Sequence, residues 1–333
     1  MQPIAARQIS TSPRMKTLRN LQGPALTLAL LCMLWLIVIV GLLALKPSVF
    51  NLGTVTTILQ FSTILALVGL GQGLVIMAGG AGIDLSVGGA VSLSAIVAML
   101  CLKLGLPPVL LPAVCILAGA MLGALNGWLV NGLALLPFIA TLGTFFVYSG
   151  AALAITGGAA QAGVPSWLLA WGRGVVMGIP LPFLTLAIPC FALASLVLLS
   201  TAWGRWIYAM GFNERSARLV GIPVDRVRLV LYALSGALAG AAGLVSIAWL
   251  GSGRPNIGQN LELESLTAAM LGGIAITGGR GGVGGVFAAV LLLVTLKTGL
   301  LQLNINTVWQ VGIVGALLVF VLLADRLSQR WRS

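Results

Sequence analysis

Long apolar runs separated by short polar stretches fill most of this chain. Ten such runs can be delimited, and most approach the ~20 residues that a helix needs to cross a bilayer. They are residues 25–45, 54–77, 85–102, 109–130, 134–156, 182–200, 229–250, 265–277, 283–301 and 308–323. The pattern predicts an all-α polytopic membrane protein with about ten transmembrane helices. Some are expected to be broken or re-entrant, because 265–277 is short and glycines interrupt Gln72–Ala90.

The distribution of charged residues predicts how the chain is oriented in the membrane. Only 7% of the residues are charged, against roughly 25% in soluble domains. The net charge of +12 comes from basic residues interleaved with the spans, so membrane topology explains it better than nucleic-acid binding. With ten crossings and a cytoplasmic N-terminus, 13 of the 18 basic residues face the cytoplasm. We therefore expect a cytoplasmic tail (1–24), a transmembrane domain (25–323) and a cytoplasmic C-terminal tail (324–333).

A basic loop at 203–228 is the longest polar interruption after the N-terminal tail. Asn213 is a good helix N-cap, and Glu214 follows at the positive end of the helix dipole. Gly221 and Pro223 end the helix, and Glu214 and Arg218 are spaced to pair on one face. Ala217 is small enough for close approach. The loop therefore predicts a short helix, 214–220, that docks into a soluble partner; a loop that only sets membrane orientation is the alternative.

The segment AGGAGIDLSVGGA (78–90) holds the only carboxylate before Glu214. Its glycines break helical continuity, and Asp84 can cap the next helix through amides near Ser86. Broken helices at membrane depth are tolerated where they line a cavity or are buried in protein. Asp84 and Ser86 are therefore either a structural cap or a polar element of a transport route or its gate.

A second glycine-rich break, TGGRGGVGG (277–285), looks similar to the first. Six helices separate the two, so both are expected at the same side of the membrane. That placement argues against their being halves of an inverted repeat. Between them, Asn126, Asn131 and Thr141 add polar groups to apolar spans; helix packing is the simpler reading, and hydrogen bonds to a neutral hydroxylated solute are the other.

Two outer segments are long enough to carry a function. Residues 157–181 contain Trp167, Trp171 and Arg173 and are typical of an interfacial hairpin. Residues 251–264 carry Arg254, Glu262 and Glu264. They are read either as a solvated turn whose carboxylates cap the next helix or as a contact surface for an external partner.

Catalysis by this chain is not expected. It has no histidine and no phosphate-binding GxxxxGK[ST] loop, so it is not a P-loop ATPase by itself. Its four cysteines lie in apolar runs without metal-like spacing and are expected to be buried thiols with no disulfide role. We predict no metal and no cofactor. A proton relay through the core is hard to build from so few carboxylates, so another subunit is expected to supply the driving force.

Four blocks resemble the permease subunits of bacterial ABC importers of the ribose, galactose and xylose type, whose relatives also carry the autoinducer-2 signal. They span most of the chain: 79–95, 126–130 with 136–144, 211–245 and 261–285. The resemblance implies that the third block contacts the ATPase, through Asn213, Glu214, Ala217, Arg218 and Gly221. This chain departs from the family at Arg215–Ser216, where two alanines are frequent, at Leu133–Leu136, where a basic residue is often seen, and in the extra Gly and Ala around 80–82.

The resemblance also implies alternating access. Two permease subunits, identical or sister chains, would enclose a route for a small neutral solute such as a monosaccharide, with Asp84, Ser86, Asn126 and Thr141 on the route or its gate. A periplasmic solute-binding protein would meet Arg254, Glu262 and Glu264. A branched-chain amino acid or nucleoside permease is the nearest alternative. A facilitator that needs no ATPase, or a membrane scaffold, is disfavoured by the docking helix and the glycine-broken spans.

Overall fold

The structure is a computed structural model that describes residues 24–330. The predicted N-terminal tail therefore lies outside the described residues apart from Pro24, and so do residues 331–333 of the predicted C-terminal tail. The last helix runs to Arg330, past the boundary expected at 324, so the first part of that predicted tail is a helical extension of the final span.

Every predicted apolar run contains a helix, and together the helices give an all-α bundle. The spans are α2 (Pro24–Leu45), α3 (Leu52–Met77), α4 (Val87–Lys103), α5 (Leu111–Gly132), α6 (Pro137–Thr156), α8 (Ile188–Ser200), α11 (Val224–Leu250), α12 (Leu261–Leu271), α13 (Val283–Gln302) and α14 (Thr307–Arg330). Seven helical segments of the described chain are long and apolar enough to cross a membrane. A π-helical turn, Phe183–Ala187, brings α8 to such a length.

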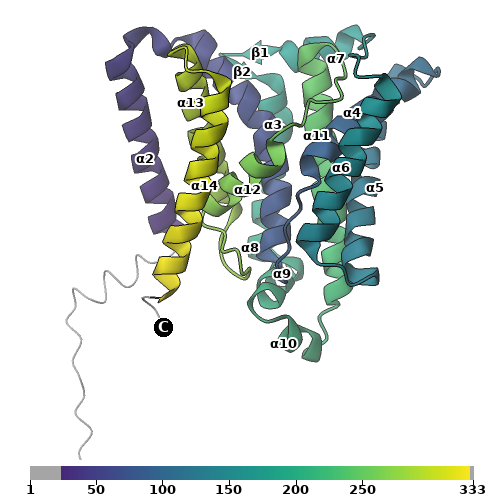
Figure 1. Cartoon of the computed structure of the whole chain (residues 1–333), viewed down its shortest axis with the longest axis vertical. Coiled ribbons are helices and arrows are strands. Elements are labelled where there is room, and N and C mark those ends of the chain that lie inside the picture. Colours follow the sequence, from purple (N-terminus) through teal and green to yellow (C-terminus); the bar gives the residue numbers. More distant parts are fainter. Residues whose placement is uncertain (1–23, 331–333) are drawn as a thin grey trace, which may run out of the picture.

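The connecting elements lie at the two ends of this bundle (Figure 1). At one end are α7 (Ser166–Arg173) and a hairpin of β1 (Val175–Val176) and β2 (Ile179–Pro180), which form the expected interfacial segment. Short 3₁₀ turns cover Pro47–Val49 and Pro108–Leu110. At the opposite end are α9 (Ala202–Phe212) and α10 (Glu214–Leu219). The start of α2 and the end of α14 both lie at the α10 end, as an even number of crossings requires.

The first broken span is an extended segment followed by a short helix. Residues 78–86 leave α3 at the α10 end, and α4 then completes the crossing. The direction of α4 follows from its contacts with α11, because Gly243 approaches Val91 and Gly253 approaches Met99. The break predicted around 78–90 is therefore present, and its non-helical part lies in the half of the bundle nearer α10.

The second broken span has the same parts in the opposite direction. Residues 251–260 do not stay at the outer surface but run back into the bundle along α4, where Gly258 donates its amide hydrogen to Ser92 Oγ (3.0 Å). There the backbones of Gly258 and Gly88 touch, so the first turns of α4 and α12 meet inside the bundle. From that point α12 runs beside α3 toward the α10 end, with Ala268 next to Gly69 and Ile274 next to Gly73.

These two spans reveal an inverted repeat, and the two glycine-rich breaks are not its halves, as predicted. Elements α3 to α6 run down, up, down and up, whereas α11 to α14 run up, down, up and down (Figure 1). The two glycine-rich breaks do lie at the same end, as expected, since Gly79 contacts Gly278. However, the counterpart of 78–86 is 251–260 and not 277–285. One short sequence match lies at corresponding positions of the two copies: Gly-Leu-Val at 73–75 and 243–245.

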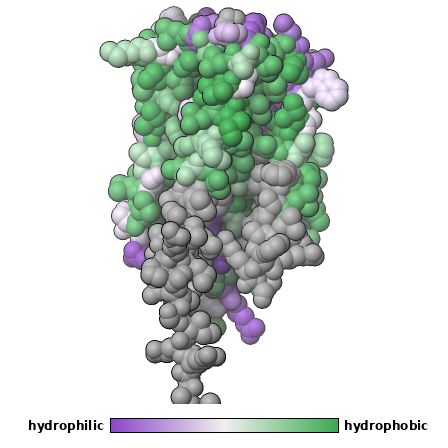
Figure 2. Space-filling view, turned by 90° about the vertical axis from the view of Figure 1, so that its left-hand side faces the viewer, coloured by the Kyte–Doolittle hydropathy of each residue, from purple (hydrophilic) through white to green (hydrophobic). Residues whose placement is uncertain are grey.

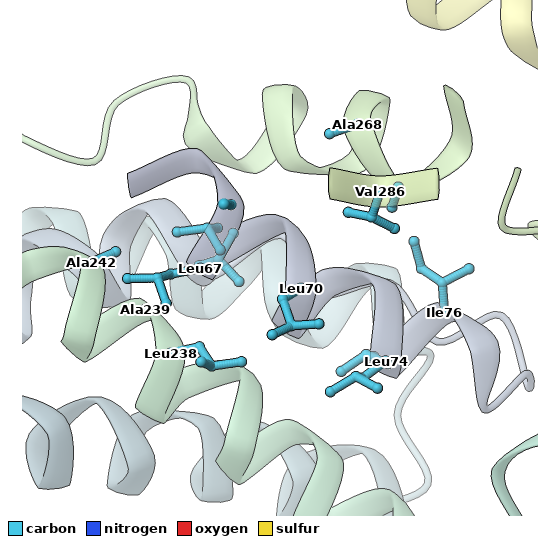
Figure 3. Packing of buried hydrophobic residues seen from close by; sticks show 14 of the residues in the cluster. Leu67, Leu70, Leu74, Ile76, Leu238, Ala239, Ala242, Ala268 and Val286 are labelled. Carbon is cyan, nitrogen blue, oxygen red and sulfur yellow. The ribbon is translucent and has the colours of Figure 1, made fainter. Parts of the chain in front are cut away.

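Helix α3 is the centre of the core. It lies between α11 on one side and α12 and α13 on the other (Figure 3). Small residues of α11, such as Ala239 and Ala242, and Ala268 of α12 let the backbones approach, and Leu67, Leu70 and Leu74 of α3 fill the remaining space. Both α3 and α11 are largely buried within a single chain, so they form the scaffold against which the broken spans are held.

The outer helices expose apolar side chains. In Figure 2 a hydrophobic surface occupies the height between the polar ends of the bundle, as expected for contact with lipid. Cys32 of α2 is exposed there, Cys101 and Cys190 are partly exposed, and Cys115 is buried; all four are free thiols. The expectation that the cysteines are buried is thus wrong for Cys32, which lies on a helix that packs on only part of its surface.

Candidate coupling and gating sites

Helix α10 is a short helix built by local contacts. The side chain of Asn213 accepts a hydrogen bond from the Ser216 amide (2.9 Å), which is the predicted N-cap. Ala217 is buried against the bundle, and Gly221 has a positive φ of 82° just beyond the helix. These features confirm the predicted local structure around α10, although the helix ends at Leu219, one residue early.

Two carboxylates and two arginines hold α10 on the bundle. Glu214 pairs with Arg218 (2.9 Å), as predicted, and also with Arg228 of α11 (2.6 Å). Arg218 in turn forms a bidentate pair with Asp225, at 2.7 and 2.6 Å. The Arg228 side chain is only 12% exposed, so its pair is the least screened; the exposed pairs contribute little individually.

These pairs also change the acidity of the carboxylates. Burial acts to raise the pKa of Glu214, but hydrogen bonds from Arg228 and Arg218 outweigh it and hold that pKa below its usual value. The hydrogen bonds from Arg218 likewise lower the pKa of Asp225. Both groups are therefore charged at neutral pH, and the cluster is stable wherever they stay ionised.

The surface that α10 leaves free is apolar and basic. Phe212, Leu219 and Val220 are 77%, 82% and 76% exposed. Four further exposed arginines at this end take part in none of the four ion pairs of the part of the chain that the structure describes. Those arginines are Arg205, Arg215, Arg226 and Arg280. Glu214 and Arg218, which the resemblance assigned to partner contact, are instead occupied with each other and with α11.

Asp84 lies inside the bundle with every oxygen used. Its Oδ1 accepts from the Ser86 amide (3.1 Å) and the Ser86 hydroxyl (2.6 Å), and its Oδ2 accepts from Ser235 Oγ of α11 (2.9 Å). The residue is 1% exposed. The predicted cap by Asp84 is present, and the contact with Ser235 makes it a tie between the first broken span and α11.

The other predicted pathway residues extend this network. Asn126 of α5 donates from Nδ2 to Ser86 Oγ (2.6 Å), and Tyr148 of α6 donates to the Leu122 carbonyl (2.9 Å) and lies 3.4 Å from Asn126 Oδ1. Thr141 of α6 donates to the Ile83 carbonyl (3.1 Å). The structure therefore brings Asp84, Ser86, Asn126 and Thr141 together as a buried cluster that joins 78–86 to three helices.

The three residues expected at the outer surface are separated by the structure. Arg254 is exposed. Glu264 faces the interior and pairs with Lys297 of α13 (2.6 Å) with only 13% of its side chain exposed. The carboxylate of Glu262 lies next to Gly88 where the two short helices meet, and its Oε2 has no hydrogen-bond partner among the described residues. The expectation of a solvated turn is wrong for both glutamates, because 251–260 carries them into the bundle.

A cavity of about 380 Å³ lies beside the Glu264–Lys297 pair. Apolar side chains from α3, α11 and α13 form most of its wall, including Phe61 and Trp249, whose rings pack edge to face at 4.8 Å. A sugar needs several convergent polar groups, and Glu264, Lys297 and Gln310 of this wall already form hydrogen bonds within the chain. We therefore do not assign the cavity to a hydroxylated solute.

Sequence reasoning missed Arg228, Ser235 and Tyr148. Arg228 was counted only as loop charge, and Ser235 and Tyr148 were not singled out within apolar spans. A serine or a tyrosine in a span carries some signal, because a buried hydroxyl needs a partner. Their partners are more than twenty residues away or on another helix, so the pairing itself could not be read from spacing.

Comparison with known proteins shows the family of the chain. Residues 54–322 match the family model described as branched-chain amino acid transport system / permease component. The chain is 35% identical to the ribose import permease protein RbsC of Bacillus subtilis, covering 87% of this chain and 89% of that protein. It is 38% identical to the autoinducer 2 import system permease protein LsrC of Klebsiella pneumoniae, covering 87% and 84%.

A third relative is the D-allose transport system permease protein AlsC of Escherichia coli, which is 35% identical and covers 86% of this chain and 88% of its own length. No solved structure matches the chain. The matched region includes both broken spans and α10, so the features described above fall inside the part that the relatives share.

Proposed function

Because the chain belongs to the family of permease components of branched-chain amino acid type transport systems, we propose that it is the membrane-spanning permease of an ABC importer for a monosaccharide. The observation that carries this proposal is the joint presence of sugar-importer relatives over nearly the whole chain and a capped, ion-paired helix projecting from one end of the bundle. A helix held so firmly is suited to receive force from a partner.

A neutral solute fits the interior of the chain. The buried carboxylate of the first broken span is saturated with hydrogen bonds from Ser86 and Ser235, and Glu264 is paired. An ionic substrate would need a free opposite charge, because burying an unpaired charge is costly. The names of the ribose, autoinducer-2 and allose relatives favour a sugar-like solute over a branched-chain amino acid.

We propose that α10 is the coupling helix and faces the cytoplasm. The excess of basic residues at its end of the bundle supports this orientation. Asn213, Glu214, Ala217, Arg218 and Gly221 build and anchor the helix, whereas Phe212, Arg215, Leu219 and Val220 form its free surface. A separate ATPase would therefore receive α10 in a groove with an apolar floor and an acidic rim.

The other assembly partners are proposed from the family. A periplasmic solute-binding protein would dock at the opposite end, where Arg254 is exposed; Glu262 and Glu264 are too enclosed to take part in that contact. A second permease, identical or a sister chain, would complete the solute route. Asp84, Ser86, Asn126 and Thr141 would then form a lock on the first broken span rather than a binding site for the solute.

The test is purification of the chain from its own membranes in mild detergent. We expect a P-loop ATPase to co-purify, and we expect vesicles containing the complex and its binding protein to accumulate radiolabelled ribose, allose, galactose or xylose only with internal ATP. Glu214→Arg should leave membrane insertion intact and abolish coupled uptake. Normal uptake by that variant would remove this residue from coupling.

A matched pair of variants tests the contact surface. Leu219→Glu places a charge on the free face of α10, whereas Leu104→Glu alters an equally exposed leucine (79% against 82%) at the end of α4 far from α10. Only Leu219→Glu should lose the ATPase. If the chain purifies alone and moves sugar without ATP, the importer proposal is wrong and the protein is a facilitator. If the complex takes up branched-chain amino acids instead of sugars, the proposed substrate class is wrong.

A further inference from the structure

Three backbone segments meet at a junction of glycines at the inner end of the bundle. Gly211 is the penultimate residue of α9. Gly79 lies just after the end of α3, in the non-helical part of the first broken span, and Gly278 and Gly279 lie between α12 and α13. A Cβ atom added to Gly79 would lie 2.7 Å from Gly211 Cα, and one added to Gly278 would lie 2.5 Å from Gly79 Cα. The segments are also joined by a hydrogen bond from the Gly279 amide to the Met77 carbonyl (2.9 Å).

Gly211 is the residue that this contact constrains most directly. A methyl group there would overlap both the Met77 carbonyl oxygen and the Gly279 amide nitrogen. Gly211 lies within α9 and has no positive φ. Glycine weakens a helix relative to alanine, so helix formation gives no reason for glycine at this position. The close approach of three backbones does.

Helix α10 is tied to the same place by charge. Gly211 is two residues before Asn213, the N-cap of α10. The Arg228 guanidinium, paired with Glu214, lies over Gly80, where an added Cβ would come within 2.7 Å of Arg228 Nη2. Both the start of α10 and its main anchoring pair therefore rest on the 78–86 segment.

From the junction, one path leads along each broken span. Residues 78–86 continue to Asp84 and its ties to α5, α6 and α11. Residues 272–282 continue back into α12, whose first turn meets the first turn of α4 at Gly258 and Gly88. A displacement of the end of α9 thus acts on both broken spans, and on the place inside the bundle where they meet.

We propose that Gly211 is a positioning residue of the transport cycle, through which movement of α10 reaches both broken spans at once. The inference rests on the proposed function, because it takes the ATPase to act on α10. Rigid, backbone-to-backbone contact transmits small shifts well, since packed interfaces do not deform continuously. The Arg228–Glu214 pair serves as a second, charge-based link from α10 to the first span alone.

The test uses the complete complex in vesicles and measures the number of ATP molecules hydrolysed per sugar accumulated. Gly211→Ala should assemble and hydrolyse ATP, while the ratio of ATP to sugar rises about tenfold, within the range usual for coupling between sites. Gly41→Ala, on α2 with no atom within 4 Å of the new methyl, is the matched control and should keep the ratio of the unchanged chain.

Arg228→Gln provides an independent measurement that leaves the glycine packing intact. It should raise the ratio by a smaller factor, and Arg228→Lys should restore part of the loss. An assembled Gly211→Ala complex with an unchanged ratio would overturn the proposal. If that complex does not assemble, an unchanged ratio in an assembled Gly278→Ala complex, whose added methyl meets the Gly79 backbone at the same junction, would overturn it. If the unchanged complex shows no ATP-dependent sugar uptake, the proposed function itself is wrong. That result is distinguishable from a failure of the Gly211 proposal, which appears only in the variants.

Discussion

The two broken spans share one architecture but are held in different ways. In the first span, side-chain hydrogen bonds hold the segment: Asp84 accepts from Ser86 and Ser235, and Asn126 donates to Ser86. In the second span, backbone contacts at glycines hold the non-helical part, Glu264 forms a single ion pair with Lys297 of α13, and Glu262 has an oxygen without a partner in the described part of the chain. A directional, buried network resists displacement more than apposed backbones do, so we infer that, of the two spans that α10 reaches, the first is displaced less and the second more.

The largest effect is expected from Asp84→Ala. This change leaves the Ser86 amide, the Ser86 hydroxyl and the Ser235 hydroxyl without their acceptor in a buried site. Unsatisfied buried groups cost 1–3 kcal/mol each, so we expect a loss of about 3 kcal/mol or more in stability, seen as a lower midpoint in thermal unfolding in detergent. Asp84→Asn keeps an acceptor oxygen and should lose less stability, while still impairing uptake more than expression. Equal loss of stability in both variants would contradict the network.

Gly258→Ala should have the next largest effect. The added methyl would strike the Gly88 backbone, separating the first turns of α4 and α12. Overpacking of this kind costs about 1–3 kcal/mol, and sugar uptake in vesicles should fall sharply. Gly150→Ala, which adds a methyl to α6 with no atom within 4 Å, is the control for stability. Normal uptake by Gly258→Ala would show that transport does not need the close contact between the first turns of α4 and α12.

Acid should loosen α10 from the first span by protonating Glu214. Because the folded pKa of Glu214 is held below its usual value of 4.5, the stability that its pairs provide is present above that value and lost as the pH falls through the lowered pKa. The backbone contacts at Gly278 and Gly279 contain no titratable group.

A spin label on Leu219→Cys measures this loosening. The unchanged chain, which has only its native cysteines, is the blank, and a label on Leu104→Cys is the control. The mobility of the Leu219 label should rise only below about pH 4.5, the usual range of a glutamate. A rise already at neutral pH, or an equal rise at Leu104, would contradict the assignment to Glu214.

The smallest effect is expected from Glu262→Gln. The carboxylate has no opposite charge to lose, and a neutral amide is less costly to bury. We expect thermal stability to change by less than about 1 kcal/mol, or to increase slightly. A loss comparable to that of Asp84→Ala would mean that the Glu262 carboxylate itself holds the second span in place.

Local sequence signals predicted the local structure of the site. The cap by Asn213, the Glu214–Arg218 pair, the left-handed Gly221 and the cap by Asp84 all depend on residues within a few positions of each other. The number of spans and their broken character followed from hydrophobic runs and glycines, because these patterns report the bilayer directly.

The misses depend on contacts between distant segments. Residues 251–264 are polar enough to suggest a surface turn, yet Gly253 and Gly258 let that segment lie against α4 inside the bundle. The inverted repeat was hidden because its copies share only short matches, such as Gly-Leu-Val at 73–75 and 243–245, while a more conspicuous pair of glycine runs lies at one end. Arg228 and Ser235 gain their roles only from partners that folding supplies.

Hydrogen–deuterium exchange on the purified complex, with and without trapped ATP, tests the central claim most directly. The account predicts that nucleotide changes the exchange of peptides from 251–260 and 272–282, because α10 displaces the second broken span, while peptides from 78–86 change much less. Equal changes in both spans, or a change confined to 78–86, would contradict a first span that is displaced less than the second.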